Sequence, residues 1–132
     1  MKYMLLMQFS SESGIAPMDA WSPEDVKAHI EFMHDLNRGL VEAGELVDAQ
    51  GLAMPGQARI VRAGEGGVPV VTDGPFPETK EFLIGYWIVD CEGPERAYEL
   101  AARISAAPGL NGEPLSMPIE VRQVMAAPSQ EL

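Results

Sequence analysis

The fold is decided by the stretch FLIGYWIVDC, residues 82–91. β-branched and aromatic side chains are enriched in strands, and here they are Ile84, Tyr86, Trp87, Ile88 and Val89. Because such side chains fall on both faces of an extended chain, the stretch predicts a strand that is covered on both sides.

A second strand with apolar residues on both faces opens the chain at residues 2–9, with Met4 and Leu6 on one face and Tyr3, Leu5, Met7 and Phe9 on the other. Weaker strand patterns occupy residues 46–53 and 119–125. Residues 58–62 and 68–72 flank a glycine-rich turn and predict a β-hairpin.

Two helices are predicted between these strands. Ser22 is placed as an N-cap with Pro23 at the first helical position, and Gly44 is placed as the residue that ends the helix. The apolar face of this helix is formed by Val26, Ile30, Met33, Leu36, Leu40 and Ala43. The second helix begins at Gly93 and Pro94, and its apolar positions are Ala97, Leu100, Ala101 and Ile104.

With the hairpin set aside, the order is strand, helix, strand, strand, helix, strand. This βαββαβ order predicts an α+β fold of the ferredoxin-like type, with both helices on one face of an antiparallel sheet. The other face would then expose the apolar residues of the two strongest strands. We therefore expect a two-fold homodimer in which two sheets stack face to face.

Composition fits one globular domain over residues 1–132, with 46% apolar and 22% charged residues. The formal charge of -11 repels phosphate and anionic lipid, which argues against nucleic acid and membrane partners. Cys91 is the single cysteine and cannot form an internal disulfide, and residues 1–9 lack the apolar length of a signal peptide. We expect a soluble, cytoplasmic protein.

Asp73 is the first candidate site residue, because Asp73-Gly74-Pro75-Phe76-Pro77 contains two prolines that stiffen the backbone around it. Pro75 has no N–H, so the Asp73 carboxylate must find another partner than that residue. One interpretation is that the segment only sets the entry angle of the next strand. The other is that it holds a carboxylate rigidly in a functional site.

His29 is the second candidate, because the helical periodicity places it inside the apolar arc, whereas His34 falls toward the margin. A lone histidine there is commonly a core residue with its ring nitrogens satisfied. It could also meet a carboxylate from a neighbouring loop and work as a general acid or base. The sequence contains no spacing typical of a zinc, phosphate or dinucleotide site, so we expect neither a metal nor a cofactor.

The run of residues 73–81, together with residues 85–91, resembles the signature of the YCII-related family and specifically its DGPF subgroup. Residues 1–6 and 101–104 also resemble that family. The resemblance implies a dimeric α+β barrel of ferredoxin-like chains, with His29 and Asp73 at the positions of a proposed catalytic pair. Departures from the family pattern are Ile84, Pro77 and a longer loop at residues 110–118.

Two hypotheses for function follow. In the first, the protein is a cofactor-independent enzyme acting on a small organic molecule, with Asp73 orienting His29 in a cleft walled by Phe76, Tyr86 or Trp87. In the second, it is a non-catalytic dimeric module that binds a ligand or regulates a partner. The resemblance favours a link to sigma factors of the extracytoplasmic type in this second case.

Overall fold

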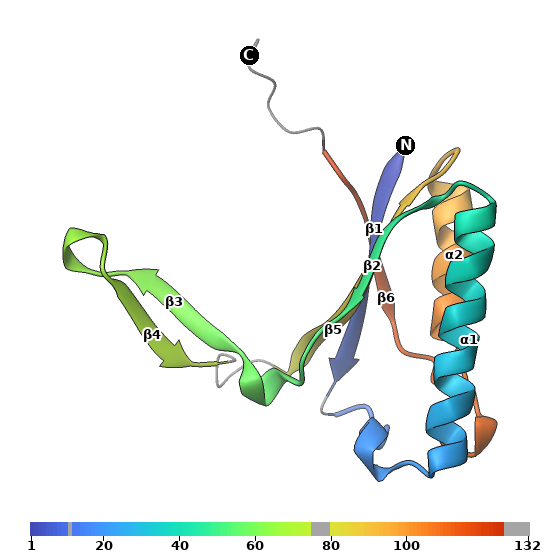
Figure 1. The fold of residues 1–132 in the computed structure, drawn as a ribbon, viewed down its shortest axis with the longest axis horizontal. Helices are drawn as coiled ribbons and strands as arrows, with labels where there is room; N and C mark the ends of the chain where they lie inside the picture. The colour runs from blue at the N-terminus through green and yellow to red at the C-terminus, as the bar shows by residue number, and fades with distance from the viewer. Residues whose placement is uncertain (11, 75–79, 126–132) are drawn as a thin grey trace.

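The computed structural model describes residues 1–10, 12–74 and 80–125. A four-stranded antiparallel sheet forms the body, in the order β2 (Leu46–Gly51), β5 (Glu81–Asp90), β1 (Lys2–Ser10) and β6 (Ile119–Gln123). Helices α1 (Pro23–Glu42) and α2 (Pro94–Ser105) lie together on one face of the sheet (Figure 1). The chain therefore has a ferredoxin-like α+β fold, as predicted.

The two strongly patterned strands are neighbours at the centre of the sheet. β1 pairs with β5 in an antiparallel register that places Leu5 opposite Trp87. The core lies between this pair and the helices, and its largest fully buried side chains are Leu5, Leu40, Val89, Leu100 and Ile104. The alternation along both strands thus selects which face receives the helices.

Local sequence signals set the ends of α1. The Ser22 hydroxyl accepts a hydrogen bond from the Asp25 backbone N–H at 3.2 Å, as expected of an N-cap. Gly44 follows the helix with a φ of 73°, in the left-handed region that favours glycine. Both helix-end predictions are confirmed.

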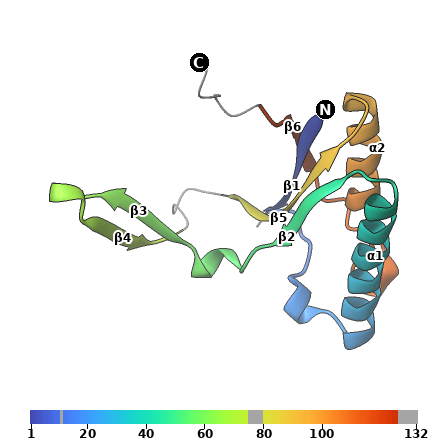
Figure 2. The ribbon, with the colours of Figure 1, turned by 45° about the horizontal axis from the view of Figure 1, so that its top comes forward.

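The predicted hairpin is present as β3 (Arg59–Ala63) and β4 (Pro69–Asp73), which form a separate two-stranded sheet. It extends away from the body in both ribbon views (Figure 1, Figure 2). Val61 lies opposite Val71 in the hairpin, and both side chains are exposed.

The loop after α2 folds back beneath the helices. Leu115 and Met117 are both buried in the core, and the backbone N–H of Leu115 donates to the carbonyl of Ala107 at 2.9 Å. The longer loop noted in the sequence is therefore packed into the core of the protein. Across the three described ranges, no helix is both long and apolar enough to cross a bilayer.

Candidate functional site: a pocket between α1 and the sheet

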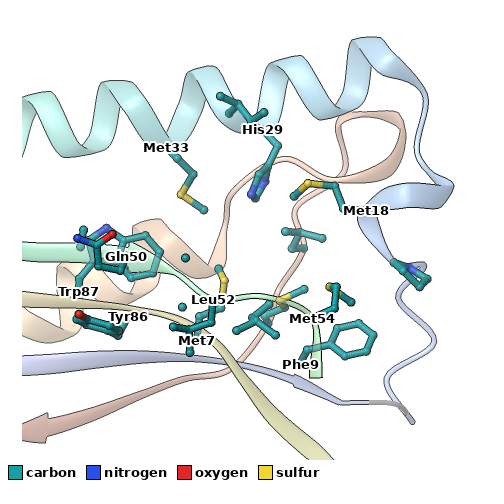
Figure 3. Close-up of a pocket in the computed structure, with 18 of the residues that line it drawn as sticks. Met7, Phe9, Met18, His29, Met33, Gln50, Leu52, Met54, Tyr86 and Trp87 are labelled. Atoms are coloured by element: carbon teal, nitrogen blue, oxygen red, sulfur yellow. The ribbon is translucent and has the colours of Figure 1, made fainter. Parts of the chain in front are cut away.

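A pocket of about 450 Å³ opens between α1 and strands β1, β2 and β5 (Figure 3). Most of its wall is apolar and rich in methionine, with Met7, Met18, Met33, Met54 and Met117 among the lining residues. Methionine side chains are flexible and polarizable, so they adapt to ligands of irregular shape. A pocket of this volume is within the range that holds small organic molecules.

Helix α1 supplies the roof of the pocket. His29, Met33 and Asn37 are spaced four residues apart, so they lie along one face of the helix. Figure 3 shows the His29 ring and the Met33 side chain pointing from α1 toward the sheet. The spacing that predicted an apolar helix face therefore also carries two polar side chains into a largely apolar space.

His29 is buried, with only 8% of its surface exposed. Its Nδ1 lies 3.0 Å from the carbonyl oxygen of Pro108, and a carbonyl oxygen can only accept a hydrogen bond. Nδ1 must therefore carry the hydrogen, and in the neutral ring the lone pair lies on Nε2.

Trp21 holds the other side of the His29 ring. The two rings meet edge to face, with centroids 5.5 Å apart and planes at 76°. The Trp21 Nε1 donates to the carbonyl of Ala16 at 3.0 Å, which fixes the indole in turn. These contacts fix the histidine in one orientation.

Asn37 is held from the sheet side. Trp87 Nε1 donates to Asn37 Oδ1 at 2.8 Å, and because an indole N–H can only donate, this contact sets which way round the amide lies. The Asn37 amide NH₂ is then left as a donor.

A cluster of polar side chains lies at the edge of the pocket, on β2 and β5, and consists of Asp48, Gln50 and Tyr86. Asp48 accepts from the Tyr86 hydroxyl at 2.8 Å and from Gln50 Nε2 at 3.1 Å. The hydrogen bond from Tyr86 lowers the pKa of the Asp48 carboxyl, with Gln50 adding to the effect, and the same bond raises the pKa of Tyr86. The Tyr86 hydroxyl and the Gln50 amide nitrogen are thus engaged with a carboxylate that does not itself line the pocket.

The pocket wall contains no Asp, Glu, Lys or Arg among the residues that the structure describes. His34 lies at its margin and is exposed. No group of three or more His, Cys, Asp or Glu side chains capable of holding a metal occurs within the described ranges.

The structure does not bring Asp73 and His29 together within one chain. Asp73 is the last residue of β4, its side chain is 95% exposed, and its carboxylate lies 3.5 Å from Arg59 Nε of the same hairpin. It does not line the pocket. Of the predicted aromatic walls, Tyr86 and Trp87 do line it, whereas Phe76 falls outside the described residues.

Sequence reasoning missed Pro108 and Asn37. The Pro108 carbonyl reaches His29 from a position 79 residues away, and Trp87 reaches Asn37 across 50 residues. Only the spacing of Asn37 from His29, two helical turns along the same face, could have singled it out. Five of the eight methionines in the chain line the pocket.

Together these features define a ferredoxin-like α+β protein with an uncharged, methionine-rich pocket under its first helix. Comparison with known proteins places this chain more closely, because the model of the YCII-related domain matches residues 1–112. An uncharacterized protein of Rhizobium meliloti (strain 1021) is 34% identical to it over 103 residues, which are 78% of each chain. The chain belongs to the YCII-related family.

Proposed function

We propose that this protein binds a small, uncharged and largely apolar organic molecule in the pocket beneath α1. The observation that carries the proposal is His29, a buried histidine whose Nδ1 is occupied by the Pro108 carbonyl while its ring points into an apolar space. Apolar pockets with few, well-oriented polar groups are typical of ligand sites. The absence of charged side chains from the described wall favours a ligand without charge.

The methionines provide a direct test with a control inside the same molecule. Octan-1-ol would be titrated into protein labelled with carbon-13 at the methionine methyl groups, and binding followed by NMR. The signals of Met7, Met18, Met33, Met54 and Met117 should move together, while those of Met1, Met4 and Met125 stay in place. A uniform shift of all eight signals, or none at all, would contradict binding in this pocket.

A second candidate function, proton-transfer catalysis, is favoured by the His29 tautomer. A histidine whose Nε2 carries a free lone pair in a largely apolar pocket is suited to act as a general base. In deuterated water, wild-type protein should then speed deuterium exchange at the acidic C–H bonds of phenylacetone. His29→Asn keeps a donor for the Pro108 carbonyl but lacks Nε2, so it should lose this rate.

The matched control for that experiment is His34→Asn, which changes the exposed histidine at the pocket margin. It should leave the exchange rate unchanged. Equal rates for wild type and His29→Asn would favour the alternative hypothesis, a non-catalytic ligand-binding or regulatory module. Such a module would bind octan-1-ol but would not catalyse the exchange reaction.

A role for Asp73 as the partner of a pocket histidine requires a second copy of the chain. The hairpin carries Asp73 away from its own pocket, so a carboxylate from this position would have to meet the His29 of a partner protomer. We propose that the protein forms a homodimer, the dimeric α+β barrel. In that form Asp73 would contact His29 of the partner protomer, and this contact would give the DGPF subgroup signature at Asp73 its function. The half-buried Met4, Leu6 and Ile88 on the sheet face without helices support that dimer.

A further inference from the structure

The polar atoms of the pocket narrow the chemistry of its ligand, an inference that rests on the proposed binding function. Nearly every polar side chain in the wall has its partner within the chain: Trp21 with Ala16, Trp87 with Asn37, and both Tyr86 and Gln50 with Asp48. What is left over on α1, apart from the exposed ring of His34 at the pocket margin, is one atom of His29 and one of Asn37.

These two atoms, His29 Nε2 and Asn37 Nδ2, have no hydrogen-bond partner within the described residues. Neither is sealed off, because no described side-chain nitrogen or oxygen is both fully buried and without a partner. Both residues line the pocket. The unpaired hydrogen-bonding atoms of both residues are therefore available to a molecule inside the pocket.

The two atoms have opposite hydrogen-bonding roles. The Pro108 carbonyl fixes the hydrogen of the neutral His29 ring on Nδ1, which makes Nε2 an acceptor. Trp87 Nε1 fixes the Asn37 oxygen as its acceptor, which makes the Asn37 NH₂ a donor. The Pro108 carbonyl can only accept a hydrogen bond and the Trp87 indole N–H can only donate one, so each fixes the role of the residue that it contacts.

The residues that carry them are eight positions apart on one face of α1, a rise of about 12 Å. Met33 lies between them on the same face, and the sheet opposite contributes Met7. The wall between the two polar atoms is therefore apolar.

We propose that the ligand is an elongated, uncharged molecule with an apolar middle, a hydroxyl or N–H donor at the end that meets His29, and a carbonyl acceptor at the end that meets Asn37. An anionic end group in place of the carbonyl would be desolvated without a counter-charge, which is costly. A site that hydrogen-bonds one end group discriminates strongly against analogues that leave its polar atoms unpaired.

The first test compares octan-1-ol, 8-hydroxyoctanamide and 8-hydroxyoctanoate as probes, using the methionine NMR signals. The amide should bind about tenfold more tightly than the alcohol, as expected when a donor that is otherwise unpaired gains one good hydrogen bond. The carboxylate should bind more weakly than the amide. Equal affinities for amide and carboxylate would overturn the proposal.

A second test replaces the hydrogen-bond donor of Asn37 by an acceptor. Asn37→Asp retains an oxygen for Trp87 Nε1 and replaces the NH₂ by a second oxygen of the same size, so the fold should be kept. Its affinity for 8-hydroxyoctanamide should fall by about tenfold, while its affinity for the cation of 8-aminooctan-1-ol should rise. An unchanged preference for the amide would overturn the assignment of Asn37.

Failure of this inference differs from failure of the proposed function. If octan-1-ol moves the pocket methionines but the amide group adds no affinity, the pocket binds apolar molecules and only the ligand polarity is wrong. If none of these probes moves the pocket methionines, both proposals are overturned.

Discussion

His29 and Asn37 show how single residues in this protein take their chemical roles from partners distant in the sequence. A histidine on an apolar helix face could be a core residue or a functional one, and the periodicity by itself leaves both interpretations open. The Pro108 carbonyl decides the position of the hydrogen on the ring, and Trp87 decides the orientation of the amide. Neither contact could be predicted, because each depends on tertiary packing and on no local rule.

Asn37 should also matter for stability. Asn37→Leu would leave the largely buried Trp87 Nε1 without its acceptor, which should lower the free energy of unfolding by about 1–2 kcal/mol. Asn37→Asp, which keeps the oxygen, is the control and should be much less affected. Urea unfolding measures both, and equal losses for the two variants would contradict this role for the hydrogen bond.

At the scale of elements, the sequence predicted the strands and helices well because local rules determine them. Alternating apolar residues, the Ser22 cap and the positive φ of Gly44 all act within a few positions. The direction in which the hairpin projects could not be predicted, because it depends on the connections around β3 and β4 and on no property of their own residues. Placing Asp73 beside His29 rested on that missing information.

The contact between Glu45, which precedes β2, and Arg96 of α2 should make the stability of the protein depend on pH. Arg96 donates to both oxygens of Glu45, at 2.8 and 3.0 Å, and this hydrogen bonding lowers the pKa of Glu45 from its ordinary 4.5. A lowered pKa in the folded state means that the stabilisation is present above the unfolded-state pKa and is lost as the pH falls through the folded one.

Glu45→Gln should therefore cost about 1–2 kcal/mol of unfolding free energy at pH 7, since the Glu45 and Arg96 side chains are only 14% and 29% exposed. The difference from wild type should be smaller at an acidic pH, once the pH has fallen through the lowered folded-state pKa of Glu45. Urea titrations at the two pH values measure it. A difference that grows on acidification would contradict the assignment.

At the scale of the whole molecule, the described part of the chain leaves one sheet face without helices, and its hairpin projects away from the body (Figure 1, Figure 2). Isolated two-stranded hairpins are at best marginally stable in water, and the valines of this hairpin are exposed. A two-fold dimer would cover the sheet face, and by symmetry each hairpin would meet the same surface of the other copy. The sequence predicted the need for such a cover, because the two central strands carry apolar residues on both faces.

Light scattering should give a mass twice the 14.3 kDa of one chain. Leu6→Lys places a charge on the sheet face and should shift the protein to monomer. Val41→Lys changes an apolar residue on α1 that is 62% exposed, and it should leave the dimer intact. A wild-type monomer at micromolar concentration, or equal effects of the two substitutions, would rule out the stacked-sheet dimer.

The most direct test of the pocket is nitrogen-15 NMR of His29, recorded above neutral pH with and without octan-1-ol. We expect the hydrogen on Nδ1 and a free lone pair on Nε2, with the Nε2 signal moving when the alcohol donates to it. A hydrogen on Nε2 of His29, or an Nε2 signal that stays fixed while the pocket methionines move, would contradict the proposal.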